Sequence, residues 1–242
     1  MKRLLLLLLP CFALTAFLPQ KNITGEQILK KMYSRYSGNW YKNFTFTQTT
    51  ENYRNDSPVK TATWYEAIVF PDYFRISFGD IKDGNAMLQI KDSVFNFRKG
   101  KMFRKSLKGQ DHTFLLGGMY FIPFDSVKVR MEKEGYDISK AYESEWKGKK
   151  VYVLGANSAV EKTNQLWIEK DRLILVRFLK YEGANKEEAI FGDHKKFGKA
   201  RSETSCSFFV NDKLIQTEKY NDCRVNTNVD MRLFDPYNFY QQ

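Results

Sequence analysis

The chain's two histidines are the side chains best suited to general acid–base work near neutral pH, and each follows an aspartate. The pairs are Asp111-His112 and Asp193-His194. A histidine–carboxylate relay needs both side chains on one side of the backbone, but adjacent residues of a strand point to opposite faces. We therefore expect each histidine at the surface or in a turn, without a catalytic role.

The cysteines and carboxylates also indicate no catalytic or metal-binding site. Three cysteines and two histidines are too few for a cysteine-rich zinc module or a multi-histidine site. The motifs G-x-S-x-G, H-E-x-x-H and C-x-x-C and a phosphate-binding glycine loop are absent from the sequence. Folding can pair distant carboxylates, as in glycosidases, but no spacing here singles out such a pair. The sequence therefore predicts no catalytic residue, no metal and no cofactor.

Cys206 and Cys223 are predicted to be free thiols. If Asn211-Asp212 is the turn of a regular hairpin, Cys206 faces Thr217 and Cys223 faces Ala200. The two cysteines are then offset by about 20 Å along the strand direction. A disulfide requires Cα atoms within about 7 Å, so the register excludes this bond.

Composition indicates a folded β protein. The 242 residues are 43% hydrophobic and include 20 Phe, 14 Tyr and 4 Trp, which are residue types that favour strands. The net charge of +11 admits two interpretations. It can attract an acidic or membrane-surface partner, or the lysines can simply keep an apolar β protein soluble.

The N-terminus is predicted to be a cleaved secretory signal. Met1–Arg3 is basic and 4–18 is almost entirely apolar. This run is shorter than the ~20 residues that span a bilayer, which argues against an uncleaved anchor. Pro10 before Cys11 argues against a lipidated cysteine. We expect residues 1–19 to be the signal peptide and residues 20–242 to be one exported, periplasmic domain, for which nucleic acid is not a partner.

One helix precedes many strands in the expected organisation. Thr24 and Gln27 form a capping-box pattern, and apolar residues then recur at helical spacing to Tyr36. Period-two alternation dominates the rest of the chain, including the stretches 188–197 and 201–210. The apolar segment 112–124 interrupts it and leads into a charged helix, 126–134, with Asp125 as its cap. A mainly β antiparallel domain of about ten or eleven strands with a few helices fits this pattern.

The order of the segments resembles a known family. After the signal and the helix come F-T-F-T-Q (44–48), the Trp64-Tyr65 strand, F-P-D-Y-F-R-I-S-F (70–78), the apolar segment around 114–116, L-W-I-E-K-D-R-L (166–173) and L-F-D-P (233–236). From about Thr24 to Pro236 the chain resembles the periplasmic lipoprotein carriers, the LolA/LolB-like outer-membrane lipoprotein-sorting proteins.

The resemblance implies an unclosed antiparallel β-barrel wrapped round a hydrophobic cavity, with helices as a lid. It also implies a function: shielding the acyl chains of lipoproteins, or other lipids, between an inner-membrane donor complex and an outer-membrane acceptor. We expect the carrier to be a monomer. One departure concerns the lid, because carriers of this family commonly hold an arginine where Phe70 precedes Pro71 here.

Alternating aromatic residues identify the expected cavity. A half-closed sheet with such a face needs a cover, which the helix 24–36 and the segment 114–121 can supply, with Gly117-Gly118 allowing movement. The alternative is that these aromatic residues form a filled core. The predicted cavity residues are Phe44, Phe46, Trp64, Phe74, Ile76, Phe78, Phe95, Phe97, Leu115, Leu116, Met119, Trp167 and Phe178.

Two other functions remain open from the sequence. One is a periplasmic sensor that shares this fold and reports lipoprotein or envelope status to a protein partner. The other is an exported enzyme on a β scaffold. Co-purified lipid favours a carrier, whereas a stable protein partner favours the sensor.

Overall fold

The computed structural model describes residues 23–107 and 112–239. The predicted signal peptide, residues 1–19, lies outside the described residues. In the described part of the chain, no helix is long and apolar enough to cross a membrane.

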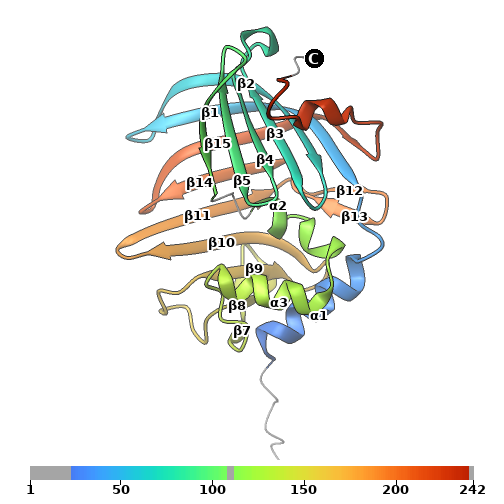
Figure 1. Ribbon diagram of the computed structural model, residues 1–242. Coiled ribbons are helices and arrows are strands. Elements are labelled where there is room, and N and C mark those ends of the chain that lie inside the picture. Colours follow the sequence, from blue (N-terminus) through green and yellow to red (C-terminus); the bar gives the residue numbers. More distant parts are fainter. Residues whose placement is uncertain (1–22, 108–111, 240–242) are drawn as a thin grey trace, which may run out of the picture.

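Thirteen strands of the described residues form one antiparallel sheet (Figure 1). Its order is β6-β5-β4-β3-β2-β1-β15-β14-β11-β10-β9-β8-β7, so β6 and β7 are the two edges of the sheet that the described strands form, and the predicted unclosed sheet is confirmed. The strands are β1 Asn43–Arg54, β2 Ser57–Val69, β3 Tyr73–Phe78, β4 Ala86–Ile90, β5 Ser93–Arg98, β6 Lys101–Ser106, β7 Ala141–Trp146, β8 Lys149–Leu154, β9 Gln165–Glu169, β10 Ile174–Glu182, β11 Asn185–Gly192, β14 Ser205–Val210 and β15 Lys213–Val225.

The sheet has more strands than the ten or eleven expected. The predicted stretch 188–197 ends as a strand at Gly192, because Asp193 adopts a positive φ of 47° and turns the chain. A separate two-stranded hairpin follows, β12 Lys195–Phe197 and β13 Ala200–Ser202. Two meanders become one sheet where β1 pairs with β15, the last strand of the chain.

Among the described residues, α1 precedes the sheet, whereas α2, η2 and α3 lie between β6 and β7 in the sequence; the short helices η1 and η3 follow β3 and β15. α1, Gly25–Tyr36, begins with the predicted capping box of Thr24 and Gln27. α3, Phe124–Lys133, begins two residues before the expected start, and Asp125 is not its cap. Instead, Asp125 forms an ion pair with Lys128 at 3.0 Å. The remaining helical elements are α2 His112–Leu115, η1 Ile81–Asp83, η2 Gly118–Phe121 and η3 Met231–Phe234.

α1 and α3 lie against the β7–β10 end of the sheet (Figure 1). Ile28 and Leu29 of α1 are fully buried, and Met131 of α3 belongs to the same core. Leu154 and Ile168 meet these side chains from β8 and β9. This part of the inner face is therefore a filled core.

The C-terminal segment covers the outer face of the sheet. Leu233 and Phe234 of η3 pack on Ala67 of β2. The buried Arg75 donates a hydrogen bond from Nη1 to the Leu233 carbonyl at 2.8 Å. The L-F-D-P motif therefore ties the chain end to the outside of the curved sheet.

Both described cysteines are free thiols, as predicted. The turn Asn211-Asp212 has positive φ at both positions, which a two-residue hairpin turn of this type requires. The expected register is wrong by one residue, because a bulge between Phe208 and Phe209 places Cys206 opposite Glu218. This shift does not bring the two cysteines together.

Candidate functional site

A cavity of about 400 Å³ occupies the part of the inner face that α1 and α3 leave uncovered. Strands β1 to β4, β10, β11, β14 and β15 contribute to its wall. Its described lining consists of Tyr41, Phe44, Phe46, Trp64, Glu66, Ile68, Phe70, Phe74, Ile76, Phe78, Met87, His112, Thr113, Leu116, Phe178, Glu187, Glu188, Phe191, Ser202, Glu203, Phe208, Phe209, Val210, Ile215, Gln216, Glu218 and Tyr220.

Most of the predicted cavity residues are brought together in this wall. The Phe44 and Phe46 rings pack at a tilt along β1 with centroids 4.8 Å apart, and Trp64 packs edge to face on Phe78 across β2 and β3 at 5.0 Å. The predicted residues that line the cavity are Phe44, Phe46, Trp64, Phe74, Ile76, Phe78, Leu116 and Phe178.

Phe95 and Phe97 lie on the outer face of the sheet, which corrects the expectation that they line the cavity. They pack with Leu88, and the Phe97 ring lies 4.6 Å from that of Phe239. Val94, their neighbour on β5, faces inward instead. Alternation correctly predicts that Phe95 and Phe97 share a face, but it does not say which face is the inner one.

Leu115, Met119 and Trp167 are also outside the cavity wall. Leu115 and Met119 are 4% and 1% exposed and belong to the filled core under α1 and α3. The Trp167 ring packs edge to face on Trp146 at 5.5 Å, and the Arg177 guanidinium lies 4.6 Å from its centre. The sequence pattern could not separate the two locations, because apolar residues with the same spacing occur both in a filled core and in a cavity wall.

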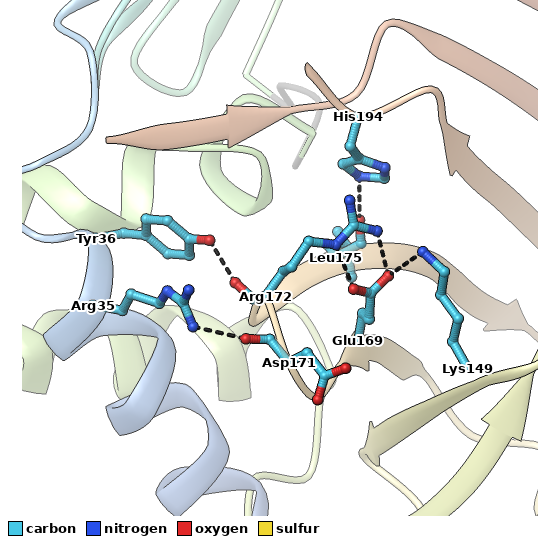
Figure 2. Close-up of polar contacts among 8 residues, drawn as sticks. All are labelled: Arg35, Tyr36, Lys149, Glu169, Asp171, Arg172, Leu175 and His194. Carbon is cyan, nitrogen blue, oxygen red and sulfur yellow. Dashed lines mark hydrogen bonds and ion pairs between the residues drawn. The ribbon is translucent and has the colours of Figure 1, made fainter. Parts of the chain in front are cut away.

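α1 does not cover the cavity, contrary to expectation, and polar contacts hold it to the β9–β10 turn (Figure 2). Arg35 donates to the Asp171 carbonyl at 2.9 Å, and the Tyr36 hydroxyl donates to the Arg172 carbonyl at 2.5 Å. The Arg172 side chain is fixed in turn by Glu169. Hydrogen bonds from Arg172 lower the pKa of the Glu169 carboxyl to about 2.

Gly117 allows the 112–121 segment to pack closely on Trp40 and Phe70, which lie just before β1 and just after β2. A Cβ at this position would lie 2.4 Å from Trp40 Nε1 and 2.7 Å from the Phe70 ring. The Phe70 ring stacks on that of Phe121 with centroids 5.6 Å apart. Phe70, the departure noted in the sequence, therefore makes an aromatic contact, and Gly117 is needed for close packing, which the sequence analysis did not predict.

His112 belongs to the cavity wall, so its expected place at the surface or in a turn is wrong. It begins α2, and its ring lies 5.2 Å from Phe178 and 5.7 Å from Phe208. Burial lowers the His112 pKa to about 4, which leaves the ring neutral at pH 7. The strand-alternation argument does not apply because the residue is helical. His194 lies between β11 and β12, as a turn residue should, with Nε2 3.1 Å from the Leu175 carbonyl.

Three carboxyl groups in the wall were missed by the sequence analysis: Glu66, Glu203 and Glu218, here called the acidic cluster. Burial raises the pKa of Glu203 and that of Glu218 to about 7. Burial and the two neighbouring carboxyl groups raise that of Glu66 well above its usual range. The sequence did contain evidence for one of them. Trp64, Glu66 and Ile68 are two residues apart along β2, so they share a strand face, and this spacing places Glu66 on the same face as the aromatic Trp64.

We expect the acidic cluster to make the ligand-free protein less stable as pH rises from 6.5 to 8.5. The pKa values of Glu203 and Glu218 are about 7 in the folded chain against an ordinary 4.5. The folded state then binds more protons than the unfolded state, so this stabilisation is present below about pH 4.5 and lost as pH rises through about 7. Thermal melts across this range should therefore show a falling midpoint.

The double variant Glu203→Gln/Glu218→Gln is the control for this pH dependence, and its midpoint should be flatter. The histidines oppose the effect, because burial lowers the pKa of both His112 and His194 to about 4 from 6.5, so their stabilisation still grows slightly between pH 6.5 and about 7.5. The double variant retains both histidines, so the difference between its midpoint and that of the wild type isolates the carboxyl groups. A wild-type midpoint that stays level or rises would contradict the assignment.

No protein-family model matches the chain, and no curated protein matches it either. Solved structures with a similar fold do exist. A DUF1329 family protein from Desulfovibrio piger has a TM-score of 0.62 and 14% identity, with 87% of this chain and 95% of that chain covered. A putative outer membrane lipoprotein-sorting protein domain from Vibrio parahaemolyticus has a TM-score of 0.60 and 15% identity, with coverage of 88% and 97%.

A LolA superfamily protein from Nitrosomonas europaea is also similar, with a TM-score of 0.58, 11% identity and coverage of 88% of this chain and 98% of that chain. The resemblance inferred from the order of segments is therefore confirmed at the level of the fold. The chain has the LolA-like fold, an antiparallel sheet curved around an internal cavity and left unclosed. At these identities the likeness establishes the fold alone.

Proposed function

We propose that the protein is a periplasmic carrier that binds acyl chains of lipoproteins, or of other lipids, in its cavity. The observation that carries this proposal is the uncovered part of the inner face, where mainly aromatic and aliphatic side chains surround about 400 Å³. Pockets for small ligands span roughly 300–1,000 Å³ and are mostly apolar, so this volume suits one acyl segment. Moving each methylene out of water contributes about 0.8 kcal/mol, and no catalytic group is needed.

The fold supports the same function. One of the similar structures is described as a putative lipoprotein-sorting protein domain and another as a LolA superfamily protein. A carrier of this kind works as a monomer exported by its signal peptide, residues 1–19, with residues 20–242 as one domain. It takes cargo from an inner-membrane donor and delivers it to an outer-membrane acceptor.

Filling the cavity should weaken binding. Ile76 is 7% exposed, lies on β3 and lines the cavity, so Ile76→Trp places an indole in the volume that the chain would occupy. Displacing two methylenes removes roughly 1.6 kcal/mol, which corresponds to at least about tenfold weaker binding. Titration with a fluorescent fatty-acyl probe measures the affinity, and native mass spectrometry of the exported wild-type protein identifies any lipid that co-purifies.

The matched control is Thr63→Trp, the same new side chain at an exposed position of β2. Its probe affinity should equal that of the wild type. A thermal melt of each variant separates loss of binding from loss of folding, because overpacking costs about 1–3 kcal/mol. Wild-type protein that neither carries lipid nor binds the probe would refute the carrier function.

A further inference from the structure

The acidic cluster is an unusual component of an apolar cavity. Its three carboxyl groups come from different parts of the chain: Glu66 from β2, Glu218 from β15 and Glu203 from the link between β13 and β14. Glu66 and Glu203 are only 9% and 6% exposed. Burying a carboxylate in such surroundings is costly unless a partner compensates for the lost water. The three carboxyl groups therefore need a hydrogen-bond donor or a cation to offset the lost hydration.

The described residues give the cluster only neutral hydrogen-bond donors. Glu218 accepts from Gln216 Nε2 at 2.5 Å and from the Tyr220 hydroxyl at 3.2 Å. Glu203 accepts from the Ser202 hydroxyl at 3.0 Å. Glu66 faces the cavity and has no hydrogen bond or ion pair with any residue that the structure describes.

No lysine or arginine is among the described residues of the cavity wall, and the one histidine there, His112, is neutral. Glu188, in the same wall, differs from the acidic cluster because its carboxylate forms an ion pair with the Arg177 guanidinium at 2.7 Å. Among the described residues of the cavity wall, the acidic cluster thus lacks a cation like the Arg177 guanidinium that pairs with Glu188. A cation from outside the chain would supply it.

We propose that the cavity takes amphiphiles whose polar end is a protonated amine, with the ammonium group at Glu66 and Glu218 and the alkyl chain along the aromatic wall. This inference rests on the proposed carrier function and names its ligand class. An ammonium has three hydrogen-bond donors, so it can satisfy several carboxyl oxygens at once. A metal ion suits the site less well, since in the described part of the chain no three His, Cys, Asp or Glu side chains are placed to hold one.

Three ligands of equal chain length test the head group: dodecylamine, dodecanol and dodecanoate, each below its micellar concentration at pH 7.5. We expect wild-type protein to bind dodecylamine at least tenfold more tightly than dodecanol, and dodecanoate most weakly, because an added anion meets the acidic cluster. Equal affinity for the amine and the alcohol would overturn the inference while leaving the carrier function standing. Failure of all three to bind would instead refute the carrier function.

Variants locate the ammonium site. Glu66→Gln should remove most of the preference for amine over alcohol and leave dodecanol binding within about twofold. The matched control is Glu187→Gln, which changes the same kind of side chain at an exposed position of the cavity lining and should retain the preference. A preference that survives in Glu66→Gln and in Glu218→Gln would place the ammonium elsewhere and overturn the assignment.

A pH series with wild-type protein provides a test that needs no variant. The amine stays protonated from pH 6 to 8, whereas the pKa values of Glu203 and Glu218 are near 7, so the amine preference should weaken towards pH 6. Burial raises the pKa values of the other titratable groups that face the cluster, so these stay neutral over the range: Tyr41, Cys206, Tyr220 and Cys223. An amine preference that is constant with pH would contradict the role of the cluster.

Discussion

Met119→Glu is expected to prevent folding, whereas Leu116→Glu is expected to fold and to lose most of its affinity for acyl chains. Met119 is 1% exposed inside the core beneath α1 and α3, so the new carboxyl would be buried without a partner. We expect a loss of at least about 4 kcal/mol, because this substitution combines a buried unpaired polar group with lost packing. Stabilities of single domains are about 5–15 kcal/mol, so little folded protein would remain.

Leu116 is three residues away but half-buried, and it lines the cavity. A glutamate there can reach cavity water, and it adds another carboxyl beside the chain-binding surface. Circular dichroism melts and titration with a fatty-acyl probe separate the two effects, and Glu132→Lys on the exposed side of α3 serves as the control. If Leu116→Glu binds the probe like the wild type, the 112–121 segment does not bound the binding site.

Gly155→Ala is expected to lower the melting temperature by roughly 10 °C or more. Gly155 follows β8 with φ of +98°, and an added Cβ would lie 2.1 Å from the Asn164 carbonyl oxygen. That oxygen belongs to the backbone just before β9, and the Asn164 side chain is fixed by hydrogen bonds to Glu134 and Tyr181 at 3.1 and 2.9 Å. Strain plus a backbone shift should cost at least about 3 kcal/mol, and each kcal/mol lowers the melting temperature by about 2–4 °C in a chain of this size.

Gly148→Ala is the matched control, because Gly148 has φ of +73° but no atom within 4 Å of an added Cβ. Gly148→Ala has the cost of the left-handed backbone conformation, about 1–2 kcal/mol, but its added Cβ collides with no other atom. Calorimetry of both variants should therefore give clearly different midpoints. Equal midpoints would mean that the contact between Gly155 and Asn164 relaxes at little cost.

Local features of the fold were predictable because neighbouring residues fix them. The capping box of Thr24 and Gln27 and the apolar spacing that follows define α1 without reference to the rest of the chain. The turn Asn211-Asp212 is similarly local, since Asn and Asp tolerate the positive φ that it requires. Alternation along β1 and β3 also placed Phe44, Phe46, Phe74 and Ile76 correctly on shared faces of their strands.

What packs against each face was not predictable from those patterns. Phe95 and Phe97 repeat with the same period as the residues of the cavity wall, and only the C-terminal segment shows that their face is the outer one. The apolar stripe of α1 had to be buried, but the stripe itself does not specify β8 and β9 as its partners. Hydrophobic burial has no direction, so an amphipathic element specifies the need for a partner and leaves its identity to the tertiary fold.

By itself, the sequence determined that this chain is an antiparallel β protein with one leading helix and with aromatic residues sorted onto strand faces. Only the tertiary structure decided that helices fill one part of the inner face and that another part encloses a cavity. It also decided that Glu66, Glu203 and Glu218 line the same cavity, although they lie far apart along the chain. The physical reason is that neighbouring residues set the periodicity of a strand, whereas contacts between distant residues set which strands pair. The pairing of β1 with β15 joins segments from opposite ends of the domain and so places the carboxyl groups in one cavity.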